Sequence, residues 1–127
     1  MDNLLSGRRI LVVEDEMMVL MAMEDMLADL GCESVAVAAT VDQALALIDA
    51  QGFDAAMLDV NLNGKRSYPV ADVLVTRGVP FAFSTGYGDH GRDGYYSGRP
   101  VLKKPFNHKE LAETFRELFM RIGPSIP

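Results

Sequence analysis

Three consecutive carboxylates, Glu14, Asp15 and Glu16, are the residues in this chain best suited to chemistry. They directly follow the apolar run Leu11–Val13, whose composition is typical of a buried strand. The acids are therefore expected at a strand end, close together and partly shielded from water. Two carboxylates about 5 Å apart repel each other by roughly 3 kcal/mol at an effective dielectric near 20. A folded chain that keeps them there needs a compensating interaction.

Other reactive side chains follow three further apolar segments. Asp59 ends AAMLD, Thr85 ends FAFST, and Lys104 with Pro105 lies in VLKKPF. In open α/β sheets, ligands bind beyond the carboxyl ends of the strands. Each residue alone is typical of a solvated strand end. The acids, the hydroxyl and the lysine together, in a chain of 127 residues, favour a shared site on one rim of a sheet.

Strand-like and helix-like segments alternate along the chain, which predicts an α/β fold with a doubly wound parallel sheet. Residues 1–127 are expected to form a single domain. The first and third strand candidates are continuous apolar runs, as in strands covered on both faces. The five candidates are Ile10–Val13, Ser34–Ala38, Ala55–Leu58, Pro80–Ser84 and Val101–Lys103.

Helical spacing of apolar residues recurs at 41–48 and at 111–122, where Gly123 and Pro124 are expected to end the helix. Each segment is preceded by a pair of residues that can form a capping box. The capping pairs are Thr40 with Gln43 and Asn107 with Glu110.

Glycines are expected to end three helices and, in a glycine-rich interval, to prevent another helix from forming. Gly31, Gly52 and Gly78 fall just after helix candidates, where a left-handed residue is expected. The interval Gly86–Gly98 carries five glycines and has no apolar period. Each glycine inside a helix costs roughly 1 kcal/mol relative to alanine. The fourth helix of the fold is therefore expected to be short or missing.

Composition restricts the partners and the compartment. With 12 basic and 18 acidic residues the net charge is −6, which argues against binding to nucleic acid or to an anionic membrane. Cys32 is the only cysteine and is expected to be a buried apolar residue. The N-terminus is too short and polar for a secretory signal, and MMVLMAM is too short for a membrane span. A soluble cytoplasmic protein is expected.

The motifs VVEDE, MLDVNLNG, FSTGYG and KKPF, in this order, resemble the receiver domain of two-component response regulators over essentially the whole chain. The resemblance implies a flavodoxin-like strand order of 2-1-3-4-5. It implies that Asp59 is the phosphoacceptor, Thr85 the hydroxyl residue and Lys104 the lysine before proline. The bond between Lys104 and Pro105 is then expected to be cis, as is common in that family.

The same resemblance assigns Glu14 and Asp15 to the acidic pair that holds Mg²⁺. Asp15, Asp59 and the main-chain carbonyl of Asn61 are expected to bind the ion directly, since Mg²⁺ prefers oxygen ligands. Glu14 is one methylene longer than the commoner aspartate and is expected to act through a bound water. Glu16 is expected to begin the first helix, where a negative charge is favourable.

A histidine kinase is the implied phosphodonor, and Gly86 is expected to leave room for the phosphoryl group. The run VPFAFSTGYG is similar to a receiver subgroup with a PFxFATGY-like motif, whose members are often stand-alone receivers linked to kinases of the HWE class. Asn61 and Tyr87 lie where receivers tune dephosphorylation. Val101 fills the position of the usual aromatic switch residue, so switching through an aromatic rotamer is not expected there.

The first helix has two faces. Its core stripe is expected to be Leu20, Met23, Leu27 and Leu30. On the other side, adaptable methionines favour a docking face for the kinase, and burial by self-association is the alternative. The proposed docking residues are Met18, Ala22, Asp25 and Met26.

A single-domain receiver that signals through phosphorylation-dependent partner binding is the leading interpretation. A receiver-like module that is never phosphorylated is one alternative. A haloacid-dehalogenase-like phosphatase is another, although its nucleophile normally ends the first strand and is followed by an aspartate two positions on. Here Asp59 ends the third strand and Asn61 follows. Flavin binding is disfavoured because no serine- or threonine-rich phosphate loop follows the first strand.

Overall fold

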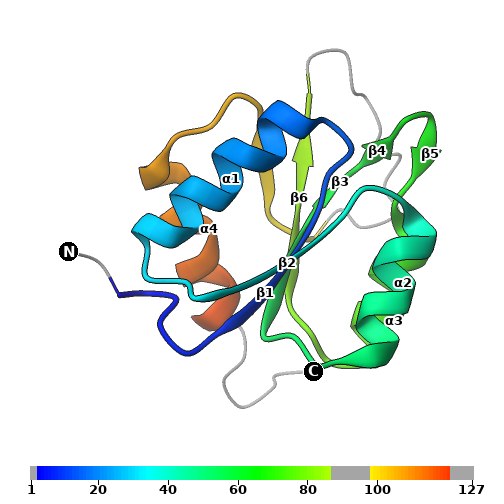
Figure 1. The fold of residues 1–127 in the computed structure, drawn as a ribbon, viewed down its shortest axis with the longest axis horizontal. Helices are drawn as coiled ribbons and strands as arrows, with labels where there is room; N and C mark the ends of the chain where they lie inside the picture. The colour runs from blue at the N-terminus through cyan, green and yellow to red at the C-terminus, as the bar shows by residue number, and fades with distance from the viewer. Residues whose placement is uncertain (1–2, 87–97, 121–127) are drawn as a thin grey trace.

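The structure, a computed structural model, describes residues 3–86 and 98–120 (Figure 1). Parallel strands alternate with helices, and a short hairpin follows the third strand. The elements are β1 (Arg9–Val13), α1 (Met17–Asp29), β2 (Ser34–Ala38), α2 (Val41–Ala50), β3 (Ala55–Asp59), β4 (Asn61–Leu62), β5 (Lys65–Arg66), α3 (Tyr68–Thr76), β6 (Phe81–Thr85), β7 (Val101–Lys103) and α4 (His108–Met120).

Five parallel strands form the main sheet in the order β2-β1-β3-β6-β7. This is the predicted order 2-1-3-4-5, because β4 and β5 pair only with each other. The five predicted strands are therefore confirmed, with ends shifted by at most one residue. The central strands β3 and β6 are buried along their whole length, as expected for strands covered on both faces.

The sheet separates two apolar cores, and alternate residues of each strand supply one core or the other. On one face Ile10 and Val12 pack with the buried sides of α1 and α4. On the opposite face Leu11 and Val13 pack with those of α2 and α3. Figure 1 shows this arrangement, with α1 and α4 on one side of the sheet and α2 and α3 on the other.

The predicted capping box of Asn107 and Glu110 forms completely. That of Thr40 and Gln43 forms only in part, since Gln43 Oε1 accepts from the Ala39 N–H at 2.8 Å and not from the Thr40 N–H. The Gln43 N–H donates to Thr40 Oγ1 at 3.1 Å, and the Asn107 and Glu110 side chains each accept from the other's main-chain N–H, at 2.8 and 2.9 Å. The Lys104–Pro105 peptide bond is cis.

Two of the three predicted left-handed glycines are confirmed. Gly31 and Gly78 have φ of 91° and 71°, each just after a helix. The prediction for Gly52 is wrong. Helix α2 ends instead at Gln51 in an extended conformation, with φ −155° and ψ 163°, so the chain leaves the helix without a left-handed residue.

The antiparallel hairpin of β4 and β5 was not predicted. Its turn residues Asn63 and Gly64 both have positive φ, 55° and 92°. An Asn-Gly dipeptide between strands is a strong signal for this kind of turn, so the sequence did contain the information. The hairpin lies beside the end of β3 and forms part of the rim on which the acids lie (Figure 1).

Several expectations fall outside the described residues. Residues 87–97 include Tyr87 and most of the glycine-rich interval, so the short or missing fourth helix stays a prediction. The predicted end of the last helix at Gly123 and Pro124 also lies outside them. Within the described ranges, none of the helices has the length and apolar character that crossing a membrane requires.

Candidate functional site

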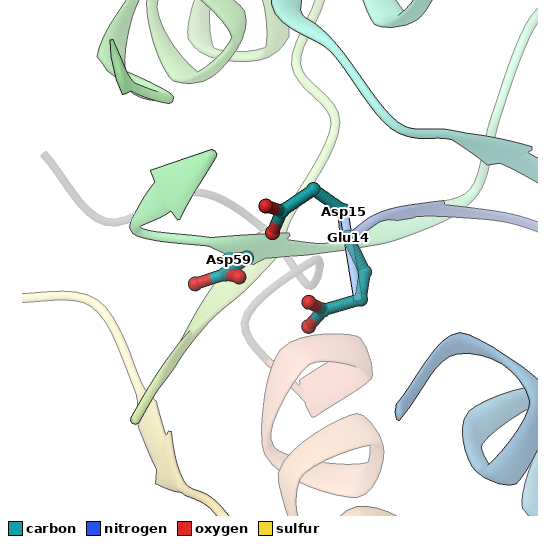
Figure 2. Close-up of side chains that lie close together, drawn as sticks. All are labelled: Glu14, Asp15 and Asp59. Atoms are coloured by element: carbon teal, nitrogen blue, oxygen red, sulfur yellow. The ribbon is translucent and has the colours of Figure 1, made fainter. Parts of the chain in front are cut away.

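The carboxylates of Glu14, Asp15 and Asp59 meet at the ends of β1 and β3 (Figure 2). One oxygen from each lies within 4.8 Å of the others. Glu14 and Asp59 are buried, with relative exposures of 1% and 3%, and Asp15 is the most open of the three. The strands that carry the acids are neighbours in the sheet, so the predicted convergence of these side chains is correct.

Lys104 reaches this cluster from the end of β7. Its Nζ lies 2.9 Å from Glu14 Oε1, 3.0 Å from Asp59 Oδ2 and 3.2 Å from Glu16 Oε1. The ammonium is thus an internal counter-ion for the acids. The main-chain N–H of Lys104 donates to the Thr85 carbonyl at 2.8 Å, which fixes the lysine next to the end of β6.

Burial and charge shift two protonation equilibria at the site. Loss of hydration and, to a smaller extent, the Glu14 charge raise the pKa of Asp59, Lys104 acts in the opposite direction, and together these effects bring the pKa to about 7. For Lys104, burial lowers the pKa, but bonding to Glu14 and Asp59 outweighs it and leaves the pKa above its usual range. Lys104 therefore remains charged, and Asp59 titrates around neutral pH.

A polar pocket of about 470 Å³ opens over these groups. Its lining residues are Asp15, Glu16, Asp59, Asn61, Asn63, Gly64, Gly86 and Lys104. The pocket therefore brings five of the predicted site residues together: Asp15, Asp59, Asn61, Gly86 and Lys104.

The position of Asn61 is fixed at both its main chain and its side chain. Its N–H donates to Asp59 Oδ1 at 3.2 Å, and its Oδ1 accepts the Gly64 N–H at 2.7 Å. The side chain therefore holds the hairpin turn at the rim of the pocket. Neither of these hydrogen bonds uses the main-chain carbonyl of Asn61, which is the group that was predicted to bind the metal.

Of the remaining predicted residues, Thr85 lies on β6 and Val101 on β7. Thr85 is the last residue of β6 and is 8% exposed, and it pairs with Lys103 of β7, while Ser84 pairs with Asp59. Val101 is 37% exposed on β7 and pairs with Phe83. Tyr87 lies outside the described residues.

Helix α1 borders a second hollow, the α1 groove, of about 410 Å³. The predicted core stripe of α1 is confirmed as buried. Of the predicted docking residues, Met18, Ala22 and Met26 line the groove, whereas Asp25 is exposed elsewhere on the helix. The other lining residues are Glu16, Val19, Met23, Gly86, Lys104, Pro105 and Phe106. Met17 and Met21, 66% and 56% exposed, were not predicted as exposed residues and lie outside the groove.

Sequence reasoning missed the role of Glu16 at the site. Glu16 does precede the first helical residue, as predicted, but its carboxylate lies against Lys104. Residues 16 and 104 are 88 positions apart, and a contact of this kind depends on side-chain geometry that neither motif encodes.

Comparison with known proteins agrees with this geometry. The family model of the response regulator receiver domain matches residues 10–116. No curated protein matches the sequence closely enough to be counted as a relative.

Among solved structures, SdrG from Sphingomonas melonis Fr1 is 43% identical, with a TM-score of 0.82 over 91% of this chain and 98% of that one. The BeF3-activated conformation of SdrG from Pseudomonas melonis Fr1 is also 43% identical, with a TM-score of 0.77 over 89% and 97% of the two chains. The receiver domain of PhyR from Erythrobacter litoralis, 21% identical with a TM-score of 0.79 over 96% and 97%, shares the fold. Because the family match covers most of the sequence, this chain belongs to the response regulator receiver domain family.

Proposed function

We propose that the protein accepts a phosphoryl group on Asp59 from the phosphohistidine of a histidine kinase, in a Mg²⁺-dependent reaction. The observation that carries this proposal is the pairing of a buried aspartate with a lysine ammonium 3.0 Å away, inside a cluster of three carboxylates. Phosphoryl transfer requires mainly positioning and charge neutralisation from a protein, and these groups supply both. The BeF3-activated conformation of the 43% identical SdrG supports the same chemistry, because BeF3 resembles a phosphoryl group.

The acid cluster fits a magnesium ion. Its ligand atoms lie within 4.8 Å of one another, and one ammonium offsets only part of the charge of three carboxylates. Asp15, Asp59 and the Asn61 carbonyl would hold the ion directly, with Glu14 behind a water. When bound, Mg²⁺ neutralises charge that develops on the phosphoryl oxygens.

Asp59 would act as the nucleophile in its ionised form. One carboxylate oxygen forms a bond to phosphorus as the bond from phosphorus to the histidine nitrogen breaks, and the electron pair stays on the imidazole. Asp59 then carries an acyl phosphate. Lys104 offers its ammonium to a phosphoryl oxygen, Thr85 offers its hydroxyl to another, and Gly86 leaves room for the group.

The kinase is proposed to belong to the HWE class and to dock on α1. The class follows from the similarity of VPFAFSTGYG to the PFxFATGY-like subgroup. The docking site is supported by the α1 groove, where exposed Met18 and Ala22 lie beside the Lys104–Pro105 turn and hence next to Asp59. A kinase helix seated there would bring its phosphohistidine close to the polar pocket.

The decisive experiment is incubation with acetyl phosphate and Mg²⁺, followed by intact mass measurement, on the wild-type protein and on Asp59→Asn. One added phosphoryl group is expected on the wild type and none on the variant. Equal labelling of both proteins would refute Asp59 as the acceptor. Repeated turnover of small phosphomonoesters would instead favour the phosphatase alternative. Absence of labelling would favour the alternative of a receiver-like module that is never phosphorylated.

A further inference from the structure

Among the residues that the structure describes, Lys104 has three carboxylate neighbours, and Glu16 differs from the other two in its exposure. The side chains of Glu14 and Asp59 are 1% and 3% exposed, whereas that of Glu16 is 62% exposed. Glu16 Oε1 accepts a hydrogen bond from Lys104 Nζ at 3.2 Å. The ammonium is therefore shared between the buried acids and a solvated one.

The Lys104 ammonium donates hydrogen bonds to Glu16 Oε1 and Asp59 Oδ2, and Glu14 Oε1 lies 2.9 Å from it as an ion-pair partner without a hydrogen bond. A phosphoryl oxygen that arrives on Asp59 competes with these three oxygens for the ammonium. The three contacts are not equally easy to give up.

Removal of the ammonium from Glu14 would leave a buried charge without its counter-ion, which carries a large desolvation penalty. Water can replace the ammonium at Glu16, because exposed ion pairs contribute little free energy. Glu16 is therefore the partner that Lys104 can exchange at the lowest cost. Glu16 and Lys104 also line both the polar pocket and the α1 groove, so their contact lies where the two hollows meet.

We propose that Glu16 is a positioning residue for phosphoryl transfer. It restrains the Lys104 ammonium in the resting site and releases one N–H donor when the phosphoryl group arrives. This inference rests on the proposed phosphorylation of Asp59. It predicts that loss of the Glu16 charge loosens Lys104 and accelerates phosphorylation by a small donor.

The test uses Glu16→Gln, with Glu24→Gln as the matched control. Each change removes one exposed carboxylate, that of Glu16 at the start of α1 or that of Glu24 within the helix. Of these two residues, only Glu16 contacts Lys104. The first readout is hydrogen exchange of the Lys104 ammonium by NMR, its signal assigned by its loss in Lys104→Ala. The second is the rate of labelling by phosphoramidate with Mg²⁺.

Faster ammonium exchange and labelling about threefold to fivefold faster are expected for Glu16→Gln, with neither change in Glu24→Gln. Unchanged exchange would overturn the inference, since faster labelling alone would then reflect a general charge effect. Labelling that is unchanged or slower would overturn it as well. Failure of the proposed function has a different signature, namely a wild-type protein without label or an Asp59→Asn variant that still takes it up.

Discussion

Asp59 and Lys104 lie 45 positions apart in the sequence, yet Asp59 Oδ2 and Lys104 Nζ are 3.0 Å apart in the structure. Their strands are not neighbours, because β6 lies between β3 and β7. The lysine side chain therefore spans the end of β6 to reach the acids of β1 and β3. This contact makes the acid cluster compatible with a folded protein before any metal binds, and the following predictions depend on it.

Stability without metal should fall as pH rises, because of Asp59. Its pKa is about 7 in the folded state and 3.8 in the reference state, so between these values the folded protein binds more protons than the unfolded chain. The free energy of unfolding must then decrease from about pH 4 and level off above about pH 7. The full difference is on the order of 4 kcal/mol.

Urea unfolding of the metal-free protein between pH 5 and pH 8, roughly the range in which Asp59 titrates, would measure this effect. Asp59→Asn lacks the titrating group, so its stability should exceed that of the wild type by an amount that grows with pH. Parallel pH profiles for the two proteins would contradict the prediction.

Lys104→Ala should destabilise the metal-free protein by about 3–5 kcal/mol, because it leaves Glu14 and Asp59 buried without their counter-ion. Millimolar Mg²⁺ should restore part of this loss by supplying another positive charge. Lys103→Ala is the control, since its side chain is exposed on the same strand. Equal urea midpoints for the two variants would rule out the counter-ion role.

Mg²⁺ should stabilise the protein more at pH 8 than at pH 6, because Asp59 must lose its proton to serve as a ligand. At ten times the dissociation constant the expected gain is about 1.4 kcal/mol. Asp15→Asn should remove most of it, whereas Asp25→Asn, an exposed change on α1, should not. Thermal unfolding with and without the ion would show the difference, and a gain that is independent of Asp15 would place the ion elsewhere.

The parallel sheet and the gathering of Asp15, Asp59 and Lys104 were predictable from the pattern of strand and helix segments, whereas the strand order was implied by the family resemblance. A short continuous apolar run between turn signals favours a buried strand, and in a parallel sheet the residue after that strand lies at the carboxyl edge. The family resemblance added the proposal that Asp59 is the phosphoacceptor. It could not supply the rotamers of long side chains, which decide whether Glu16 points toward solvent or toward Lys104.

Some local backbone features were also predictable from the sequence, and others were not. The side-chain caps at Thr40 and Asn107 were predictable because each depends on residues three positions apart. Gly52 did not adopt the expected left-handed conformation, because the C-cap residue Gln51 is already extended and takes the chain out of α2. The hairpin at Asn63 and Gly64 had a clear local signal, the Asn-Gly dipeptide, but was not predicted.

The proposed docking of the kinase predicts different effects of substitution for two pairs of exposed residues on α1. Met18 and Ala22 line the α1 groove, and Met17 and Met21 are exposed on the same helix outside it. If a kinase helix occupies the groove, replacement of both Met18 and Ala22 by lysine should slow phosphotransfer from the kinase on the order of tenfold, through charge and bulk at the contact. The Met17→Lys and Met21→Lys pair adds the same charge and should have a much smaller effect. Labelling by acetyl phosphate should proceed at the wild-type rate in both double variants, which shows that Asp59 itself is intact. Equal slowing of kinase transfer in the two variants would mean that net charge, and not the groove, decides the encounter.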